Sequence, residues 1–383
     1  MSYKLKLFDK VLLEFNIVEN LADPVVEIVW IDENSRNLLP LGMDVSNVGL
    51  AQWLKRRSIP KNRAYVNTFL AKCGLNSNRP MDVISVCRGV SLNDSYWIVE
   101  DGFDELYDNC NLYENNFSNI LAWIAFTGYG SSVRSSFASS PEFTTNGMLP
   151  KCWRRINGKV YLYKGGTSGA SNAGYEPYSE LYASQIGKSL GFDVIPYSVS
   201  KWKGNLCSVC EIFTSKDIAF VPIGRIVKTG GMKAVRSYYM ELGEQYVRAL
   251  DEMIVFDALI CNTDRHFGNF GVMVDSHTNQ IVSPAPLFDH GNSLFNFAGE
   301  ENWQDSDRMS EYINTLLPCV YEDFIEEAKT VLDDDIRHKL RKCQTLTIER
   351  EGRYNYSAER RKELTEIIQE RAKLILKQEL TDG

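Results

Sequence analysis

The chain has 383 residues, of which 44% are hydrophobic and 24% charged, a balance that supports a large buried core and excludes a disordered chain. Its formal net charge of −8 disfavours non-specific nucleic-acid binding, which relies on lysine and arginine, so we predict no direct nucleic-acid partner. No signal-peptide pattern and no stretch of ~20 apolar residues is present, and nine cysteines are scattered along the chain. We therefore expect a soluble, cytoplasmic protein without a membrane segment or a disulfide framework.

The first third of the chain predicts a mixed α/β segment over residues 1–135. Helical patterns cover residues 46–56 and 61–73, and a short apolar run over 81–87 predicts a buried strand. From residue 131 to 146 the composition shifts to serine, threonine, phenylalanine and glycine, which predicts a loop and a domain boundary.

Strand-like and helical pieces then alternate between residues 136 and 213. Asn157-Gly158 separates two of the strand patterns and predicts a tight hairpin turn. Gly191 follows the helical pattern and is a natural stop signal. In chain order, the predicted pieces are strands over 151–155 and 159–164, a helix over 178–190, and strands over 194–200 and 206–213.

Helical patterns prevail from residue 214 to the end. A long apolar helix over 243–260 ends just before the densest cluster of polar side chains, and a charged helical tail covers 358–380. The whole pattern predicts an α+β fold with an N-terminal segment (1–135), a small β-rich lobe (136–213) and a larger, mainly helical lobe (214–383).

Oxygen-bearing side chains gather in two loops of the C-terminal half. Asp264 and Asn269 lie in the first loop, and Asp289 follows the apolar run over 286–288. Phosphoryl transfer uses one carboxylate to orient the attacking hydroxyl and accept its proton, and a second carboxylate with an amide to hold Mg²⁺. The interval from Asp264 to Asn269 equals that between the catalytic Asp and the metal-binding Asn of protein kinases. We therefore predict Asp264 as catalytic, and Asn269 and Asp289 as metal ligands.

Two charged residues upstream complete the equipment of a kinase. Lys164 ends a predicted strand, and Glu180 lies in the first turn of the next predicted helix. A kinase needs a lysine on a strand to reach the phosphates of ATP, and an acid on a helix to steady that lysine. Because these residues precede Asp264 and Asp289 in the order that kinases use, the sequence predicts ATP and Mg²⁺ as cofactors.

With these motifs the chain resembles the HipA-like serine/threonine kinases, first met as toxin-antitoxin kinases of bacteria. The resemblance covers roughly residues 140 to 300. The run Asn262-Thr263-Asp264 with His266 and Asn269 resembles the catalytic loop of that family, and Leu287-Phe288-Asp289 resembles its metal-binding segment. The resemblance implies a two-lobed kinase-like fold, phosphorylation of a protein hydroxyl, and an antitoxin-like protein partner. It does not identify the acceptor protein.

The same resemblance implies where ATP would be held. Backbone groups of Glu211 and Phe213 would hold the adenine at a hinge between the lobes. The phosphate loop would fall at residues 143–151, where Asn146 and Gly147 would face the phosphates. This loop contains one glycine, fewer than many phosphate-binding loops have.

Three further features of these loops follow from the sequence. His266 is a nucleotide-contact candidate, although a role in shaping its loop fits better than a role as a base, because an acid is already present. Arg265 could face phosphate or solvent. In the resembled family a serine of the phosphate loop can be autophosphorylated, which switches the enzyme off, and the candidates here are Ser139, Ser140, Thr144 and Thr145.

Other interpretations stay open at this point. Asp264 could be a helix cap, Asp289 a turn residue and Lys164 an ordinary exposed lysine. At the level of function, the alternatives are a pseudokinase that binds nucleotide or a partner without catalysis, and a kinase for a lipid headgroup or another small molecule.

Overall fold

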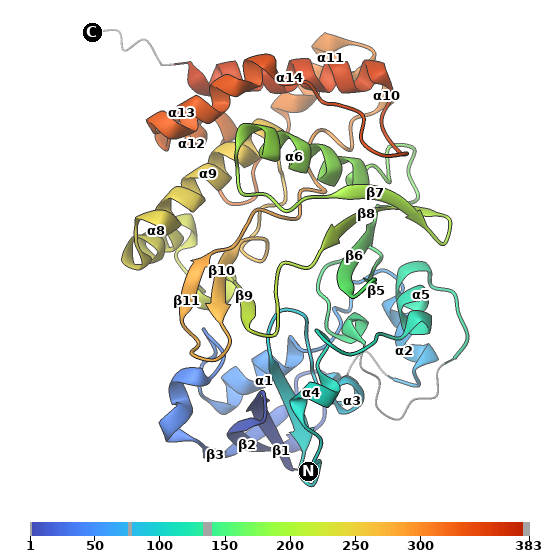
Figure 1. The fold of residues 1–383 in the computed structure, drawn as a ribbon, viewed down its shortest axis with the longest axis vertical. Helices are drawn as coiled ribbons and strands as arrows, with labels where there is room; N and C mark the ends of the chain where they lie inside the picture. Colours follow the sequence, from blue (N-terminus) through green and yellow to red (C-terminus); the bar gives the residue numbers. More distant parts are fainter. Residues whose placement is uncertain (1, 76–78, 133–139, 378–383) are drawn as a thin grey trace. The chain divides into compact units, whose positions relative to one another are not determined.

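The computed structural model describes residues 2–75, 79–132 and 140–377 (Figure 1). The chain divides into two compact units. The first unit comprises Met1–Lys164, Glu211–Val221 and Val272–Val282, and the second comprises Gly165–Cys210, Pro222–Gly271 and Ser283–Gly383. The predicted domain boundaries at residues 135 and 213 stay predictions.

The first unit begins with an antiparallel sheet whose strands lie in the order β3-β2-β1-β4. These strands are β1 (Ser2–Leu7), β2 (Lys10–Glu19), β3 (Val25–Ile31) and β4 (Tyr96–Glu100). Leu5 of β1 lies opposite Leu13 of β2 on one side and Ile98 of β4 on the other. Buried and half-buried residues alternate along β1, so one face of the sheet is available to form a core.

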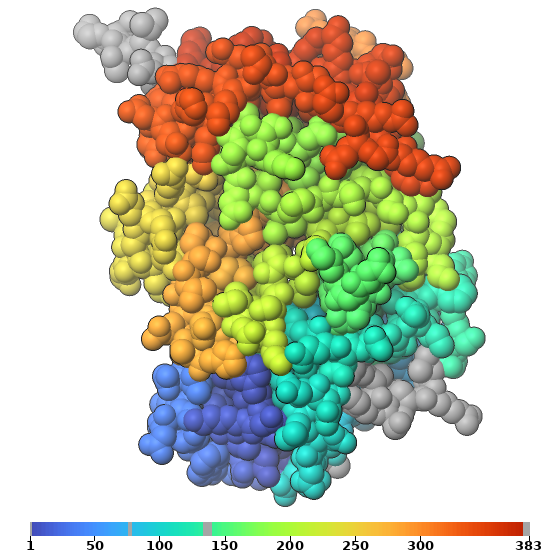
Figure 2. All heavy atoms as spheres, in the orientation of Figure 1, coloured from blue at the N-terminus to red at the C-terminus, as the bar shows by residue number. Residues whose placement is uncertain are grey.

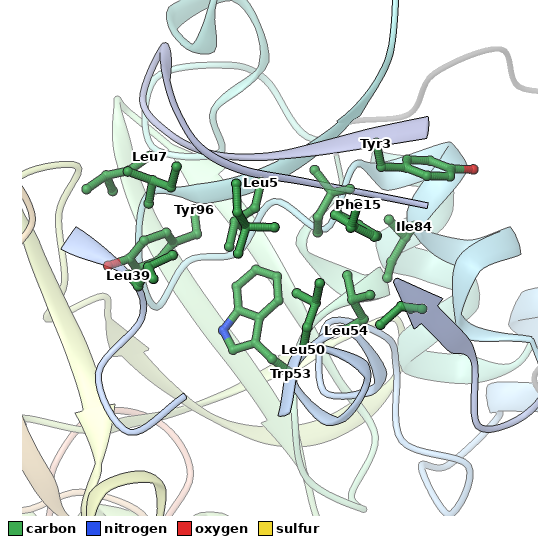
Figure 3. Close-up of a cluster of buried hydrophobic side chains, with 14 of the residues drawn as sticks. Tyr3, Leu5, Leu7, Phe15, Leu39, Leu50, Trp53, Leu54, Ile84 and Tyr96 are labelled. Carbon is green, nitrogen blue, oxygen red and sulfur yellow. The ribbon is translucent and has the colours of Figure 1, made fainter. Parts of the chain in front are cut away.

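Two helices cover this face of the sheet (Figure 3). Helix α1 (Asn47–Lys55) begins one residue after the start of the predicted pattern, because Ser46 caps it: the Ser46 side chain accepts a hydrogen bond from the Gly49 N–H at 3.0 Å. Its Leu50 and Trp53 lie in one buried cluster with Leu5 of the sheet. The N-terminal region therefore has a hydrophobic core of its own.

Residues 81–87 form part of a helix, α3 (Pro80–Cys87), so the predicted strand is wrong. Met81, Ile84 and Cys87 are buried, and their spacing of three residues places them on one helical face. Pro80 starts the helix, because proline is well tolerated in a first turn. A short apolar run does not distinguish a strand from a buried helix.

The other helices of the first unit are short. Helix α2 begins later than the pattern over 61–73 predicted, because Arg63 and Tyr65 lie in a turn: Arg63 N–H bonds to Pro60 O at 3.1 Å, and Tyr65 has a φ of 60°. These helices are η1 (Glu33–Leu38), α2 (Val66–Lys72), α4 (Tyr107–Cys110), α5 (Asn119–Thr127) and η2 (Pro141–Phe143).

The hairpin predicted at Asn157-Gly158 is confirmed. It joins β5 (Lys151–Ile156) to β6 (Lys159–Gly165), and both turn residues have positive φ angles, 51° and 81°. This geometry is that of the hairpin turns that favour Asn-Gly.

A three-stranded sheet in the order β11-β10-β9 is formed by β9 (Ile218–Pro222), β10 (Gly271–Asp275) and β11 (Ile281–Pro284).

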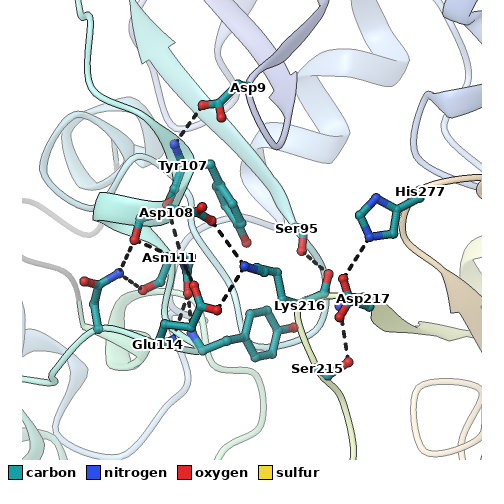
Figure 4. A network of polar contacts seen from close by, with 12 residues as sticks. Asp9, Ser95, Tyr107, Asp108, Asn111, Glu114, Ser215, Lys216, Asp217 and His277 are labelled. Carbon is teal, nitrogen blue, oxygen red and sulfur yellow. Dashed lines mark hydrogen bonds and ion pairs between the residues drawn. The ribbon is translucent and has the colours of Figure 1, made fainter.

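Polar contacts tie the segment before β9 and the turn after β10 to the N-terminal region (Figure 4). Ser95 donates a hydrogen bond to Lys216 O at 2.7 Å, and the Lys216 ammonium lies 2.9 Å from the Glu114 carboxylate. Asp217 lies 2.8 Å from the His277 ring. The space-filling view shows the β10–β11 residues in orange against the blue N-terminal residues (Figure 2). Segments far apart in sequence therefore form one unit.

The second unit contains α6 (Glu176–Leu190), which ends at Gly191 as predicted, with a φ of 86° there. An antiparallel hairpin of β7 (Ser198–Trp202) and β8 (Asn205–Glu211) follows. Strand β7 begins at Ser198, later than the predicted residue 194. Ahead of it, Val194 makes an isolated parallel bridge with Leu287.

Helices form the rest of the second unit. Those over residues 243–260 and 358–380 were predicted; the second ends at Leu376, earlier than predicted, and residues 378–380 lie outside the described part. The helices are α7 (Ile223–Ile226), α8 (Gly231–Leu242), α9 (Glu244–Ile260), α10 (Glu300–Trp303), α11 (Ser306–Asn314), α12 (Phe324–Thr330), α13 (Asp334–Arg341), η3 (Lys342–Thr345) and α14 (Ala358–Leu376). Arg371 of α14 donates to Ala258 O of α9 at 3.0 Å.

The chain is α+β, as predicted. Within residues 2–75, 79–132 and 140–377, no helix is both long and apolar enough to cross a membrane. The cytoplasmic location stays a prediction.

Candidate active site

The first candidate loop starts where α9 ends. The last turns of this helix are fully buried, and Cys261 closes it in a left-handed conformation with a φ of 50°. Asn262 then reverses the chain, because its N–H bonds to Asp257 O and its side-chain amide donates to the Asp257 carboxylate, both at 3.0 Å. The apolar helix therefore supplies a rigid base from which the polar loop projects.

Asp264 is half-buried in this loop and is fixed by two amide side chains. Its N–H donates to Asn262 Oδ1 at 3.2 Å, and its Oδ2 accepts a hydrogen bond from Asn292 Nδ2 at 3.1 Å. Asn292 also accepts, through its backbone oxygen, bonds from the N–H and the hydroxyl of Thr263 at 3.0 and 3.2 Å. The second loop thus orients the carboxylate of the first. No sequence pattern had marked Asn292 as a site residue.

Asn269 is turned by its own loop. Its side-chain nitrogen donates to Asp264 O at 3.1 Å, and its N–H donates to His266 O at 2.9 Å. Because the amide nitrogen points back at the loop, the side-chain oxygen is the atom presented for a ligand. An amide oxygen held in this way suits Mg²⁺, which prefers oxygen ligands.

Asp289 is delivered by an apolar segment that is anchored to the chain after α6. Leu287 N–H bonds to Asp193 O at 2.8 Å, and Ile195 N–H bonds to Leu287 O at 2.9 Å. Asp289 itself has a φ of 58°, a left-handed conformation that costs free energy for a residue with a side chain. Its N–H donates to the Tyr197 hydroxyl at 3.3 Å. Strained residues of this kind occur often at functional sites.

Arg265 connects the two loops from inside the second unit. Its guanidinium, 1% exposed, makes a two-pronged ion pair with Asp257 at 2.8 and 2.9 Å. It also donates to Asn269 O at 2.9 Å and to Phe288 O at 2.7 Å. Burial alone would lower the pKa of Arg265, but the charge and hydrogen bonds of Asp257 raise it. Of the two alternatives left open for this arginine, phosphate or solvent, the structure supports neither.

Glu180 also holds the second loop. It lies in α6 with no exposed surface, and its Oε2 accepts a hydrogen bond from His290 N–H at 2.7 Å. This bond fixes the backbone directly after Asp289. The predicted partner Lys164 belongs to the first unit, so the pairing of Glu180 with that lysine stays a prediction.

His266 is exposed, and its Nδ1 accepts a hydrogen bond from Gly268 N–H at 3.0 Å. This contact fits the loop-shaping role that the sequence suggested. Its role in nucleotide binding stays a prediction.

The remaining nucleotide candidates all lie in the first unit. Lys164 is 7% exposed at the end of β6, opposite Lys151 of β5. Gly147 has a φ of 95°, a left-handed conformation that favours glycine, and its nearest neighbour is the Lys151 ammonium. Asn146 beside it is exposed at the tip of the loop.

The predicted hinge begins at the end of β8. Glu211, the last residue of that strand, pairs with Lys159 at 2.9 Å. The ring of Phe213 lies edge-on to Phe220 at 5.5 Å. Ile212 between them bonds through its N–H to Val160 O at 3.0 Å.

Among the autophosphorylation candidates, Ser139 lies outside the described residues. Ser140 has no exposed surface and donates to the Glu142 carboxylate. Thr144, 4% exposed, donates to Val90 O at 2.8 Å, and the Thr145 hydroxyl donates to Pro141 O. Phosphorylation of Ser140 or Thr144 would therefore require the segment to leave this conformation.

No known family's sequence profile matches the chain, and no curated protein matches it by sequence. Among solved structures, HipA of Shewanella oneidensis MR-1, a toxin-antitoxin protein solved with HipB and operator DNA, matches with a TM-score of 0.54 and 12% identity. This match covers 97% of the chain and 96% of HipA. The chain has a HipA-like fold. The HipA-like fold extends well beyond residues 140–300, over which the motifs resemble that family.

A second solved structure is similar over part of the chain. The proinflammatory kinase CtkA of Helicobacter pylori matches with a TM-score of 0.46 and 20% identity, over 58% of this chain and 90% of CtkA.

Proposed function

We propose that this chain is an ATP- and magnesium-dependent kinase that transfers a phosphoryl group to a serine or threonine hydroxyl of a protein. The observation that carries the proposal is the way Arg265 holds together the loops of Asp264 and Asp289. Hydrogen bonds to Asn269 O and Phe288 O bring the backbones of both loops to a single guanidinium. An acid that only shapes a turn would need no such bracing.

Each residue has a distinct role in this proposal. Asp264 would accept the proton of the acceptor hydroxyl through the oxygen that does not bond to Asn292. Asn269 and Asp289 would hold Mg²⁺, which they suit because they present an amide oxygen and a carboxylate. When bound, ATP would supply the phosphoryl group and Mg²⁺ would neutralise the charge on its phosphates.

Residues of the first unit would hold the nucleotide. Lys164 would contact the phosphates, with Glu180 as its acidic partner in the order that kinases use. Asn146 and Gly147 would line the phosphate loop, and the backbone at the hinge would bind the adenine. Regulation by autophosphorylation within residues 131–151 is part of the proposal. So is an antitoxin-like partner, because the similar HipA was solved with HipB.

The test is transfer of labelled γ-phosphate from ATP to the chain itself and to a library of serine- and threonine-containing peptides. Wild type should label protein or peptide only with Mg²⁺ present. Asp264→Ala and Asp289→Ala should each lose transfer by roughly a hundredfold or more while keeping the circular dichroism of the wild type. Near-wild-type transfer by either variant would contradict the assignment.

The alternatives give different results in the same assay. A pseudokinase would bind ATP in a calorimeter but label no acceptor, and a lipid or small-molecule kinase would label only non-protein material. If mass spectrometry finds no phosphate between residues 131 and 151 after incubation with ATP, the proposed autophosphorylation is contradicted. Purification of the tagged chain from its own cells without an accompanying protein would argue against the partner.

A further inference from the structure

The predicted phosphate loop, residues 143–151, is fastened to the N-terminal region at its first residue. Phe143 is fully buried in a cluster with Val66, Phe69 and Leu70 of α2, and its ring lies 5.0 Å from that of Phe69. The beginning of the loop therefore belongs to the core that α2 forms. Thr144 follows and donates its hydroxyl hydrogen to Val90 O.

Arg63 holds the loop at two later points. Its guanidinium donates from Nη1 to Thr145 O at 3.0 Å and from Nη2 to Lys151 O at 2.5 Å. These carbonyls lie on either side of Asn146 and Gly147. One planar group thus fixes the distance between the two arms of the loop, which a flexible chain would otherwise vary.

The neighbour of Arg63 holds the middle of the loop. Ala64 N–H donates to Met148 O at 2.8 Å. Because Asn146, Gly147 and Met148 are the exposed residues, the fastened backbone carries an exposed tip. Such a tip is suited to contact a ligand while its backbone stays in place.

The burial of Arg63 marks it as a dedicated residue. Its surface is 3% exposed, and placing a guanidinium there is costly unless its hydrogen bonds repay the loss of water. Burial lowers the pKa of Arg63 to about 10, against the opposing charge of Glu142. The group still carries its proton near neutral pH, so its donors stay available to the loop.

We propose that the N-terminal region is part of the nucleotide site and that Arg63 is the residue through which it positions the phosphate loop for ATP. The inference rests on the proposed function, since it takes residues 143–151 to bind phosphates. Arg63 is a positioning residue: it contacts the loop backbone and leaves ligand contact to the exposed tip. An ordered loop binds ATP more tightly, because the entropy of ordering it is not lost at the moment of binding.

Arg57 provides a matched control in the same region. It is an arginine with 6% exposure, and it forms a two-pronged ion pair with Asp94 at 2.7 Å and a bond to Gly89 O at 3.4 Å. None of these groups belongs to the phosphate loop. Arg57→Met therefore measures what the loss of a buried arginine does to the N-terminal region in general.

The experiment compares variants of the full chain by two measurements. Calorimetry gives the Kd for Mg²⁺-ATP, and hydrogen exchange in the absence of ATP reports on residues 143–151. Arg63→Met should raise the Kd for ATP about tenfold and speed exchange in the loop. Arg63→Lys keeps the charge but not the planar guanidinium, and its Kd and loop exchange rate should lie between those of Arg63→Met and wild type. Arg57→Met should keep the Kd within about twofold of wild type and leave loop exchange unchanged.

Kinetics separate positioning from general damage. Loss of active protein lowers kcat without changing KM, whereas a loosened phosphate loop raises the KM for ATP. If Arg63→Met does not fold, the comparison of Arg63→Lys with Arg57→Met decides in its place. If the wild type binds ATP and the Arg63 and Arg57 variants have equal Kd values, the inference is overturned but the proposed function is not. A wild type that binds no ATP would overturn the proposed function together with the inference.

Discussion

Arg265 combines one carboxylate partner with two carbonyl partners inside the second unit. An ion pair with no exposed surface is stabilising only when its geometry satisfies both groups, and here the guanidinium fork matches the Asp257 carboxylate. Nη1 meets the two loop carbonyls and Nη2 also lies 3.1 Å from His290 Nδ1, so little of the cost of burial is left uncompensated. The same side chain therefore serves stability and the alignment of Asp264 with Asp289.

Removal of this guanidinium should destabilise the protein strongly. Arg265→Met leaves the Asp257 carboxylate buried without its charge partner, and we expect a loss of roughly 3–5 kcal/mol in the free energy of unfolding. Urea unfolding followed by fluorescence measures it. Arg308, whose pair with Asp305 at 3.7 Å is exposed, is the control; Arg308→Ala should cost less than about 1 kcal/mol. Equal losses in the two variants would contradict the role of Arg265.

Asn292 offers a sharper test of catalysis. Its amide contacts the Asp264 carboxylate, so Asn292→Ala should leave that group in several orientations and lower kcat about tenfold. The KM for ATP should change less than about twofold, because Asn292 contacts no predicted nucleotide residue. Asn302→Ala, which removes a side chain of α10 in the same unit, should leave kcat unchanged. A rise in the KM for ATP at constant kcat would contradict the role of Asn292 in orienting Asp264.

Single residues differ in how far the sequence reveals them. Asp264 and Asn269 were proposed as partners because kinases use their spacing, and the structure adds a direct bond between Asn269 Nδ2 and Asp264 O. Arg265 and Asn292 act across 8 and 28 positions of sequence. Their partners lie on another turn or another loop, so no local pattern identifies them.

A hairpin with a strong turn signal was predictable, and a hairpin without one was not. The Asn157-Gly158 hairpin follows from residues that tolerate positive φ angles. The hairpin of β1 and β2 turns at Phe8, which has a φ of 50° although phenylalanine rarely adopts it. No typical turn residue indicated this hairpin, and the sheet that begins with it was not predicted. Helix α3 was missed for another reason, since its run is too short for its periodicity to be read.

The short η2 element carries an acid whose titration should affect stability. Glu142 has no exposed surface, and burial raises its pKa despite hydrogen bonds from Ser140 and Trp153. The folded state therefore holds this proton more tightly than the unfolded chain does. The contribution of the group to stability is complete below the unfolded value of about 4.3 and is lost as pH rises through the raised folded value.

Glu142→Gln removes this titration while keeping a side-chain oxygen for the Trp153 N–H. We expect the free energy of unfolding of wild type to fall relative to that of the variant as pH rises above about 4.3. Urea unfolding of both proteins across a pH series tests this. If the difference in the free energy of unfolding between the two proteins does not change with pH, burial does not raise the pKa of Glu142.

At the scale of the whole molecule, the candidate residues separate by role. Apart from His266, the nucleotide candidates, among them Lys164 and Glu211, belong to the first unit, whereas Asp264, Asn269 and Asp289 belong to the second. The sequence predicted the α+β class because its patterns change from strand-like to helical along the chain. It did not predict that the HipA-like fold would span nearly the whole chain, because the motifs are confined to residues 140–300.

The most direct measurement is the affinity for ATP, with and without Mg²⁺, of wild type and three variants. We predict that Lys164→Met and Asp289→Ala each weaken Mg²⁺-ATP binding by about tenfold or more, and that Asp289→Ala behaves like wild type once Mg²⁺ is removed. Asp264→Ala should bind Mg²⁺-ATP normally but fail to transfer phosphate. Wild-type affinity for Mg²⁺-ATP in both Lys164→Met and Asp289→Ala would contradict the account.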